Sequence, residues 1–273
     1  MKNSPTKRPS SSIERGVLIQ LGNHLVYCGS ATNHKDVETL MQGQKIDLIA
    51  TDPPYGVAVV ESKEDLSSRH IPIANDQLQS HEQYVDFTRQ WLTACQSHLA
   101  DKNAFYIFNS DRMIHALLDG LKAEQFLFKQ LLVWLKTSAN IGRLDYLPQS
   151  ELIAYGWHGT HKFYKSKDKN ILIYPKTQNN KLHPTMKPVP LMRHLILNSS
   201  KVGATVYDPF SGSGSTLIAA EQAKRRCFAM ELEPKYCQII VDRFKKMTGI
   251  EPIFLTPGPG QQKINKTFEK NNG

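Results

Sequence analysis

The stretch from residue 206 to residue 216 reads Val-Tyr-Asp-Pro-Phe-Ser-Gly-Ser-Gly-Ser-Thr. It begins in an apolar segment, residues 204–207, which we predict as a buried strand, and it ends where a helical pattern begins. Asp208 stands at the end of that strand. Gly212 and Gly214 then let a ligand approach the backbone closely and expose amides at a helix N-terminus. The stretch therefore predicts a strand, a glycine-rich turn and a helix, the unit with which α/β sheets bind ligands.

The composition of this turn narrows the class of ligand. No lysine follows the second glycine, so the turn is not a Walker A loop, and Leu217 replaces the third glycine of the dinucleotide-binding pattern. Asp208 disfavours a phosphate and favours a ligand with a cationic end. Glu231 follows the next predicted strand, residues 227–230, about twenty residues further on, where an acid can bind both hydroxyls of a ribose. These residues predict a cofactor that carries a ribose and a positive charge.

A second strand end carries a different set of groups. Residues 47–50 form a short apolar strand candidate that runs directly into Thr-Asp-Pro-Pro-Tyr-Gly at residues 51–56. The two prolines stiffen the turn and remove backbone donors, which leaves the Pro53 carbonyl beside the Asp52 carboxylate. Such acceptors suit the exocyclic amino group of a planar base, with Tyr55 stacked on its ring. The alternative is a proline-rich turn that Asp52 only caps.

Strand patterns recur along the chain at short intervals. Residues 17–21 and 24–28 flank a Gly-Asn turn, which is typical of a two-residue hairpin. Further strands are predicted at residues 47–50, 104–108, 131–135, 152–155, 204–207 and 227–230.

Helical patterns stand between several of these strands. Ser80 and Gln83 resemble a capping box, and a further helix is predicted from Asp111 as its N-cap to Gly120 as its end. Other helices are predicted at about residues 189–198, 216–224 and 235–247. This alternation predicts an α/β fold, a mostly parallel twisted sheet with helices on both faces.

Polar composition sets the predicted limits of the domain. Both ends of the chain are polar and aperiodic, so we predict disordered tails at residues 1–12 and 256–273 around a domain at 13–255. Two long polar stretches, 57–76 and 140–182, interrupt the domain, and loops of that length are usually functional or mobile. The first dozen residues lack the apolar block of a signal peptide, and no segment has the ~20 apolar residues of a membrane span, so we expect a cytoplasmic protein.

The net charge of +9 is concentrated in two segments. Residues 1–12 hold three basic side chains and no acid, and residues 157–187 hold seven lysines against the single acid Asp168. Aromatic side chains such as Trp157 and Tyr164 stand among these lysines. A cationic strip of this kind favours a polyanion such as nucleic acid, because binding releases counterions. A solvated lysine-rich face is the alternative.

Three motifs resemble those of amino-group DNA methyltransferases of the permuted beta class. Asp-Pro-Pro-Tyr at residues 52–55 is the form typical of N6-adenine and some N4-cytosine enzymes. His-Pro-Thr-Met-Lys-Pro at 183–188 resembles the HPTxKP segment of the family. Asp-Pro-Phe-Ser-Gly-Ser-Gly-Ser-Thr at 208–216 resembles its cofactor loop and follows the first motif, the order that defines the beta class. The resemblance covers about residues 17–248.

The resemblance implies a Rossmann-like methyltransferase fold with S-adenosylmethionine as the cofactor. It implies that Asp52, Pro53 and Tyr55 are catalytic. In the family the HPTxKP segment lies beside the methionine part of the cofactor, and Ser30 stands where members usually carry an acid. The residues then expected around the cofactor are Ser30, Thr185, Lys187, Asp208, Phe210, Gly212, Gly214 and Glu231.

The activity implied is site-specific methyl transfer to the N6 amino group of adenine in double-stranded DNA. The target base must leave the duplex, because its amino group is otherwise paired and stacked. Asp52 and the Pro53 carbonyl would then accept hydrogen bonds from the amino group while Tyr55 holds the ring. The family's recognition segment is expected between the first two motifs, which makes residues 140–182 the candidate for reading DNA. A homodimer, a cognate restriction enzyme and the recognition sequence are left open.

The sequence leaves other activities to be compared with adenine methylation. The acceptor could instead be N4 of cytosine or an RNA base. A catalytically silent DNA-binding regulator is disfavoured because Asp52, Tyr55 and both loop glycines are intact. A protein glutamine methyltransferase more often carries Asn-Pro-Pro-Tyr after its glycine loop, which opposes that assignment. The four cysteines stand singly and none follows a proline, so neither a cysteine nucleophile nor a metal site is expected.

Overall fold

The structure is a computed structural model that describes residues 13–56, 79–139, 145–165, 167–176 and 186–255. The two predicted tails, the polar stretch at 57–76 and Thr185 lie outside the described residues. Within them, ten strands form one sheet. In their order across the sheet, the strands are β10 (Ile253–Phe254), β1 (Leu18–Leu21), β2 (His24–Cys28), β9 (Arg226–Glu231), β8 (Thr205–Asp208), β3 (Ile46–Thr51), β4 (Leu99–Asn109), β6 (Ser150–Trp157), β5 (Leu127–Leu135) and β7 (Ile171–Ile173).

The centre of the sheet is parallel and its two sides are mixed. Strands β2, β9, β8, β3 and β4 run parallel to one another. The predicted hairpin is confirmed, because β1 and β2 pair antiparallel around the Gly-Asn turn. On the other side, β6 pairs antiparallel with both β4 and β5, and β7 pairs parallel with β5.

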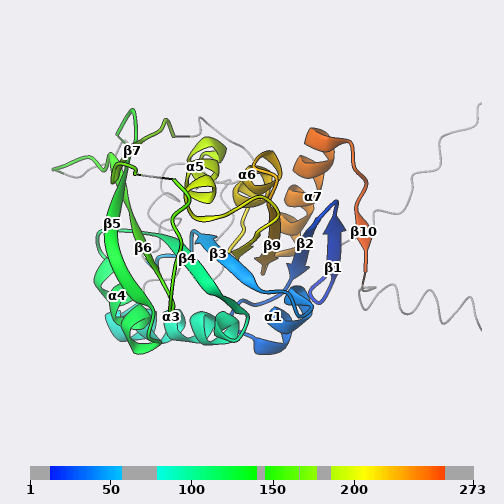
Figure 1. The fold of residues 1–273 in the computed structure, drawn as a ribbon, viewed down its shortest axis with the longest axis horizontal. Helices are drawn as coiled ribbons and strands as arrows, with labels where there is room; N and C mark the ends of the chain where they lie inside the picture. Colours follow the sequence, from blue (N-terminus) through cyan, green and yellow to red (C-terminus); the bar gives the residue numbers. More distant parts are fainter. Residues whose placement is uncertain (1–12, 57–78, 140–144, 166, 177–185, 256–273) are drawn as a thin grey trace, which may run out of the picture.

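Helices cover both faces of this sheet (Figure 1). One layer packs on the face that carries Val206 and Tyr106 and consists of α5 (Val189–Ser199), α6 (Ser215–Gln222) and α7 (Pro234–Thr248). The opposite layer packs on the face that carries Ile49 and Tyr207 and consists of α1 (His34–Met41), α3 (His81–Gln96) and α4 (Ile114–Ala123). The α/β fold predicted from the sequence, with helices on both faces, is confirmed.

Strands β8 and β3 lie side by side where the chain changes its direction of travel across the sheet. Leu48 pairs with Val206 and Ile49 with Tyr207. From β8 the chain passes through α6 to β9 on one side, whereas from β3 it passes to β4 on the other. Ligands of open α/β sheets bind at such a point, beside the carboxyl ends of the strands. The two loops singled out in the sequence therefore leave adjacent strands at one place.

The predicted capping box is present, but the helix predicted from Asp111 to Gly120 needs correction. The Ser80 hydroxyl accepts a hydrogen bond from the Gln83 amide, and the Gln83 side chain accepts one from the Ser80 amide. Helix α4 begins at Ile114 with no side-chain cap and continues past Gly120 to Ala123. A Cβ at Gly120 would lie 2.6 Å from Cγ2 of Thr88, so this glycine allows close contact with α3 and does not end the helix.

Part of the polar stretch at 140–182 belongs to the sheet. Strand β6 extends from Ser150 to Trp157 and occupies an interior position, and β7 forms an edge. The segment between them passes α5, where the Tyr164 amide donates to the Asn198 carbonyl. Helix α1 and strands β7 and β10 are also additions to the elements predicted from sequence. In the described part of the chain, no helix combines the length and apolarity required to cross a bilayer.

Candidate active site

The Asp-Pro-Pro-Tyr loop follows β3 and folds back on itself. The Tyr55 hydroxyl donates a hydrogen bond of 2.6 Å to Oδ1 of Asp52. Burial raises the pKa of the Asp52 carboxyl, and Glu151 adds to the shift, while the cation of Lys187 opposes it. Burial also raises the pKa of Tyr55 well above its ordinary value, so this hydroxyl stays protonated at neutral pH. The loop thus presents a carboxylate that is already hydrogen bonded by its own tyrosine.

A cluster of two lysines and two carboxylates surrounds this loop. Lys187 donates to Oδ2 of Asp52 and lies 3.1 Å from Oε2 of Glu151. Lys136 lies 2.7 Å from the other oxygen of that glutamate, Oε1. The side chains of Lys136 and Lys187 are only 6% and 7% exposed. Charges this deeply buried are tolerated because each has an opposite charge in contact.

The pKa shifts in the cluster follow from burial and from the neighbouring charges. Burial lowers the pKa of Lys187, but Asp52 and Glu151 outweigh it and the net shift is upward. Burial raises the pKa of Glu151, but the two lysines outweigh it and the net shift is downward. Both residues are therefore charged at neutral pH. The resemblance implied that Lys187 lies near the cofactor. In the structure its ammonium lies between Asp52 and Glu151.

Asp208 lies at the end of β8, on the strand beside the Asp-Pro-Pro-Tyr loop. It is 2% exposed, and its Oδ1 accepts hydrogen bonds from the Thr51 hydroxyl at 2.7 Å and from the Phe210 amide at 3.3 Å. Burial raises its pKa to about 6, although hydrogen bonds from Thr216 and Thr51 oppose the shift. The carboxylate is thus held rigidly between the two loops.

Glu231 closes the other side of the glycine-rich loop. Its Oε2 accepts from the Gly212 amide at 2.7 Å, and its Oε1 accepts from the Glu233 amide at 2.9 Å. Burial raises its pKa to about 7 against the effect of these two hydrogen bonds. The strand end and the loop are therefore joined through one buried carboxylate.

Two serine hydroxyls of the glycine-rich loop have no hydrogen-bond partner within the described residues. The hydroxyls of Ser211 and Ser215 are buried and make no hydrogen bond within the described residues. Gly214 has φ +80° and precedes α6, and a Cβ there would lie 3.0 Å from Ile240. Because buried hydroxyls are normally satisfied, these serines indicate a polar ligand. Their position on a turn that leads into a helix fits the predicted cofactor loop.

Two predicted cofactor residues make contacts inside the protein. The Ser30 amide donates to Asp36 at 2.8 Å, and its hydroxyl lies 2.9 Å from that of Thr32. The ring of Phe210 packs edge-on against Trp91, with ring centroids 5.8 Å apart. The family resemblance implies an acid at the position of Ser30. Here the neighbouring carboxylate comes from Asp36, which accepts the Ser30 amide.

Glu151 and Lys136 were not singled out in the sequence. Glu151 directly precedes the predicted strand 152–155, and Lys136 directly follows the predicted strand 131–135. Antiparallel pairing of β5 with β6 sets Trp134 opposite Glu151. Lys136, two residues after Trp134, thereby comes within reach of the Glu151 carboxylate. A charged residue at the end of each apolar strand was the only signal available, and it does not reveal which strands pair.

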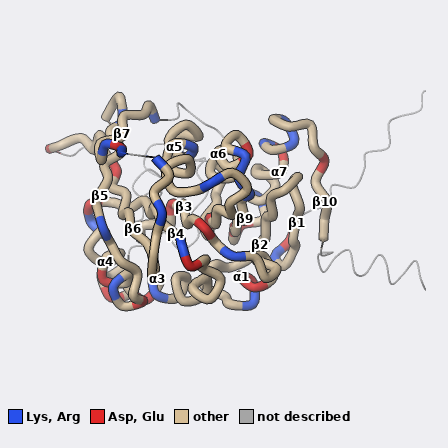
Figure 2. The backbone as a smooth tube through the Cα atoms, in the orientation of Figure 1, with Lys and Arg blue, Asp and Glu red and all other residues tan. Residues whose placement is uncertain are grey.

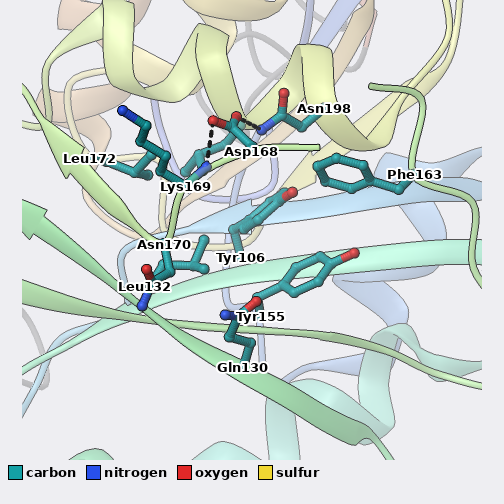
Figure 3. A pocket seen from close by; sticks show the side chains of 11 residues that line it. Tyr106, Gln130, Leu132, Tyr155, Phe163, Asp168, Lys169, Asn170, Leu172 and Asn198 are labelled. Atoms are coloured by element: carbon teal, nitrogen blue, oxygen red, sulfur yellow. Dashed lines mark hydrogen bonds between the residues drawn. The ribbon is translucent and has the colours of Figure 1, made fainter. Parts of the chain in front are cut away.

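A small cavity lies away from both loops, between the sheet and α5 (Figure 3). The rings of Tyr106 and Tyr155 face it from β4 and β6, and Asp168 lies opposite them. Its volume of about 50 Å³ has room for a few waters and not for a nucleoside. Asp168 is engaged there, because it accepts hydrogen bonds from His194 and Asn198. This cavity is not the candidate site.

The cationic strip, residues 157–187, begins at the last residue of β6 and includes β7, which pairs with β5 at an edge of the sheet. Figure 2 marks the lysines and arginines of the chain in blue. The described residues of the strip are 157–165, 167–176 and 186–187, and within them the Trp157 ring stacks on His161 with centroids 3.6 Å apart. The Lys129 ammonium lies over the Trp157 ring at 5.5 Å, and that of Lys162 lies over Tyr164 at 5.2 Å. Lysines and aromatic rings thus lie together in this strip, as its composition indicated.

The fold and the two adjacent loops define a Rossmann-like methyltransferase. A family model described as DNA methylase, for N6 and N4 methyltransferases, matches residues 46–242. The chain belongs to this N6/N4 DNA methylase family.

Individual relatives agree with this family. The chain is 24% identical over 239 residues to the type II methyltransferase M.HpaI of Haemophilus parainfluenzae, covering 78% of this chain and 73% of the relative. It is 24% identical over 230 residues to the type II methyltransferase M2.DpnII of Streptococcus pneumoniae, covering 75% and 84%.

Solved structures show the same fold. M1.HpyAVI in complex with SAM matches with a TM-score of 0.60 and 24% identity, covering 80% of this chain and 98% of that one. The cytosine-N4-specific PvuII DNA methyltransferase matches with a TM-score of 0.62 and 18% identity, covering 82% and 87%.

Proposed function

We propose that this DNA methylase transfers a methyl group from S-adenosylmethionine to the N6 amino group of adenine in double-stranded DNA. The observation that carries the proposal is the pairing of β3 with β8, which sets the acceptor loop at Asp52 beside the cofactor loop at Asp208. One loop offers oxygen acceptors and a ring to a planar amine. The cofactor loop offers buried carboxylates, and serine hydroxyls without a hydrogen-bond partner in the described part of the chain, to a cationic nucleoside.

The residues of the glycine-rich loop fit this cofactor. We assign Glu231 to the ribose hydroxyls. The Ser211 and Ser215 hydroxyls, which have no hydrogen-bond partner within the described residues, would supply further polar contacts. Asp208 provides negative charge close to the site of a sulfonium. When bound, S-adenosylmethionine would supply a methyl group that leaves sulfur, and the sulfur would keep the bonding electrons. The amino nitrogen would form the new bond to carbon and give up one proton to the solvent. We assign Thr185 and Phe210 to the surroundings of this cofactor on the resemblance alone.

The Asp-Pro-Pro-Tyr loop positions the acceptor. The Asp52 carboxylate and the Pro53 carbonyl accept hydrogen bonds from the two N–H groups of the amino group. These hydrogen bonds direct the nitrogen lone pair away from the two acceptors. Tyr55 holds the ring of a base that has left the duplex. Catalysis then rests mainly on positioning, since the reacting nitrogen is held facing the methyl group. The cationic strip supplies contacts to the DNA backbone.

Cytosine N4 is the second candidate acceptor. Its amino group offers the same two donors to Asp52 and Pro53, and the family contains enzymes for both bases. The aspartate of Asp-Pro-Pro-Tyr favours adenine. Use in a restriction-modification pair and assembly as a homodimer remain predictions from the resemblance.

The test is to identify the product and its dependence on Asp52. Unmethylated DNA is incubated with the protein and S-adenosylmethionine, digested to nucleosides and analysed by mass spectrometry. We expect N6-methyladenine, and we expect Asp52→Ala to lower its formation by a factor of about 10³ or more while cofactor affinity is kept. Asp119→Asn, an exposed acid on α4, serves as the control and should match the wild type. Only N4-methylcytosine would select the second acceptor, and no methylated base would contradict both.

A further inference from the structure

Both oxygens of the Asp52 carboxylate are engaged by the protein. Oδ1 accepts the Tyr55 hydroxyl at 2.6 Å, and Oδ2 accepts the ammonium of Lys187. Each oxygen thus already has one donor, and a target amino group that binds Asp52 from the side of either donor takes that donor's place. A displaced ammonium in this buried site needs another anion, because a buried charge without a partner costs several kcal/mol.

Glu151 provides that anion within a short movement. Its Oε2 lies 3.1 Å from the Lys187 ammonium and 3.4 Å from the Tyr55 hydroxyl. Its other oxygen, Oε1, is held by Lys136 at 2.7 Å. One oxygen of Glu151 is thus anchored, while the other faces both groups that occupy Asp52.

We propose that Glu151 is a positioning residue for methyl transfer, which accepts the Lys187 ammonium and the Tyr55 hydroxyl when the target amino group replaces them on Asp52. This inference rests on the proposed function of Asp52. Lys136 anchors Glu151 on β6, so that the acceptor stays in place when Lys187 moves.

Charge balance supports the exchange. Two lysines and two carboxylates make the cluster neutral, and a shift of Lys187 from Asp52 to Glu151 leaves it neutral. The Lys187 ammonium also lies 5.6 Å from the Tyr55 ring centroid and 5.2 Å from that of Phe108. The faces of these two rings add a favourable cation–π interaction beside the two carboxylates. The movement therefore leaves the net charge of the cluster unchanged.

The test separates an acceptor for Lys187 from a residue that only balances charge. Glu151→Gln keeps the shape of the side chain but leaves one excess positive charge. Glu151→Gln/Lys136→Met removes one charge of each sign and restores neutrality. Glu151→Asp keeps the carboxylate, and Glu251→Gln removes an exposed ion-paired acid, which bonds Lys245 at 2.7 Å, as the matched control. Each protein is assayed for Tm, for S-adenosylmethionine affinity and for single-turnover methyl transfer to unmethylated genomic DNA.

We expect Glu151→Gln to lower the single-turnover rate on the order of 10- to 100-fold with unchanged cofactor affinity. The double variant should regain the Tm lost by the single variant and should not regain the rate. Glu151→Asp should keep more rate than Glu151→Gln, and Glu251→Gln should match the wild type. A double variant that regains both Tm and rate overturns the proposal, as does a wild-type rate in Glu151→Gln. An inactive wild-type protein would instead contradict the proposed function.

Discussion

Glu231 is a buried acid, and each of its two carboxylate oxygens accepts a hydrogen bond from a backbone amide. Hydrogen bonds from Gly212 and Glu233 favour its ionised form, but burial raises its pKa to about 7. The ionisation of this one residue therefore falls within the pH range in which the protein can be studied. Asp208, with a pKa raised to about 6 by burial, titrates lower in the same range.

The raised pKa of Glu231 predicts that stability and cofactor affinity depend on pH in opposite directions. Its pKa is higher in the folded protein than the ordinary 4.5, so the folded state binds the proton more tightly. Its contribution to stability is therefore lost as pH rises from about 4.5 through about 7. The carboxylate form is the better acceptor for ribose hydroxyls, so S-adenosylmethionine should bind more tightly as pH rises through about 7.

Thermal unfolding from pH 5 to pH 9, with and without S-adenosylmethionine, measures both effects at about one-unit intervals. The increase in Tm that the cofactor causes should grow between about pH 6 and pH 8. Glu231→Gln should lose this growth near pH 7 and keep the part near pH 6 that belongs to Asp208. A cofactor effect that is equally pH-dependent in both proteins would exclude Glu231 as the group responsible.

At the scale of elements, the contact between α3 and α4 shows how a residue that usually ends helices can serve packing instead. Thr88 of α3 is fully buried against Gly120, in the interior of α4. A Cβ at that glycine would lie 2.6 Å from Thr88 Cγ2 and 3.3 Å from the Val85 carbonyl oxygen. The two helices approach this closely only because the side chain is absent.

Gly120→Ala should therefore destabilise the protein, although alanine is the better helix former. Helix propensity alone would favour alanine by about 1 kcal/mol, whereas forcing α3 and α4 apart costs typically about 1–3 kcal/mol. We expect the net free energy of unfolding to fall by up to about 2 kcal/mol, measured by urea denaturation. Lys122→Ala, at an exposed position of the same helix, is the control and should change stability little. A stability raised by about 1 kcal/mol in Gly120→Ala, the full gain in helix propensity, would show that the helices can separate at no cost.

At the scale of the whole molecule, the cationic strip extends from the active site to an edge of the sheet. The carboxylates of the site lie at the centre of the sheet, where β3 and β8 meet. Lys187 of the strip lies there with Asp52 and Glu151, whereas Lys169 and Lys176 flank the edge strand β7. A DNA duplex that spans both would place one base at the centre while its phosphates contact the strip.

The strip predicts the salt dependence of DNA binding. Replacing Lys162, Lys165, Lys167 and Lys169 with Gln should reduce the slope of log affinity against log salt by about one for each lysine that contacts a phosphate. Fluorescence anisotropy with a labelled duplex measures the slope, and S-adenosylmethionine affinity should not change. The control replaces four exposed lysines elsewhere with Gln, at positions 35, 45, 122 and 201. Equal slopes in the two quadruple variants would make the strip a solvated face.

Local patterns were sufficient for those features that depend on neighbours along the chain. Ser80 and Gln83 form the capping box because its donors and acceptors lie within one turn of helix. The strands that end at Asp208 and Glu231 could be predicted because apolar runs followed by an acid or by glycine have few other structures available.

Tertiary structure alone decided the surroundings of Asp52. Lys136, Glu151 and Lys187 come from segments far apart in the sequence, and they meet only after β6 has paired with both β4 and β5. The sequence around 140–182 is polar and weakly periodic, so it did not indicate how much of it enters the sheet. Burying a charge is favourable only when its partner is in place, and partners supplied by different strands are specified by the pairing of those strands. For this reason the loop proposed to bind the base could be predicted from the sequence, while the charges that hold its carboxylate could not.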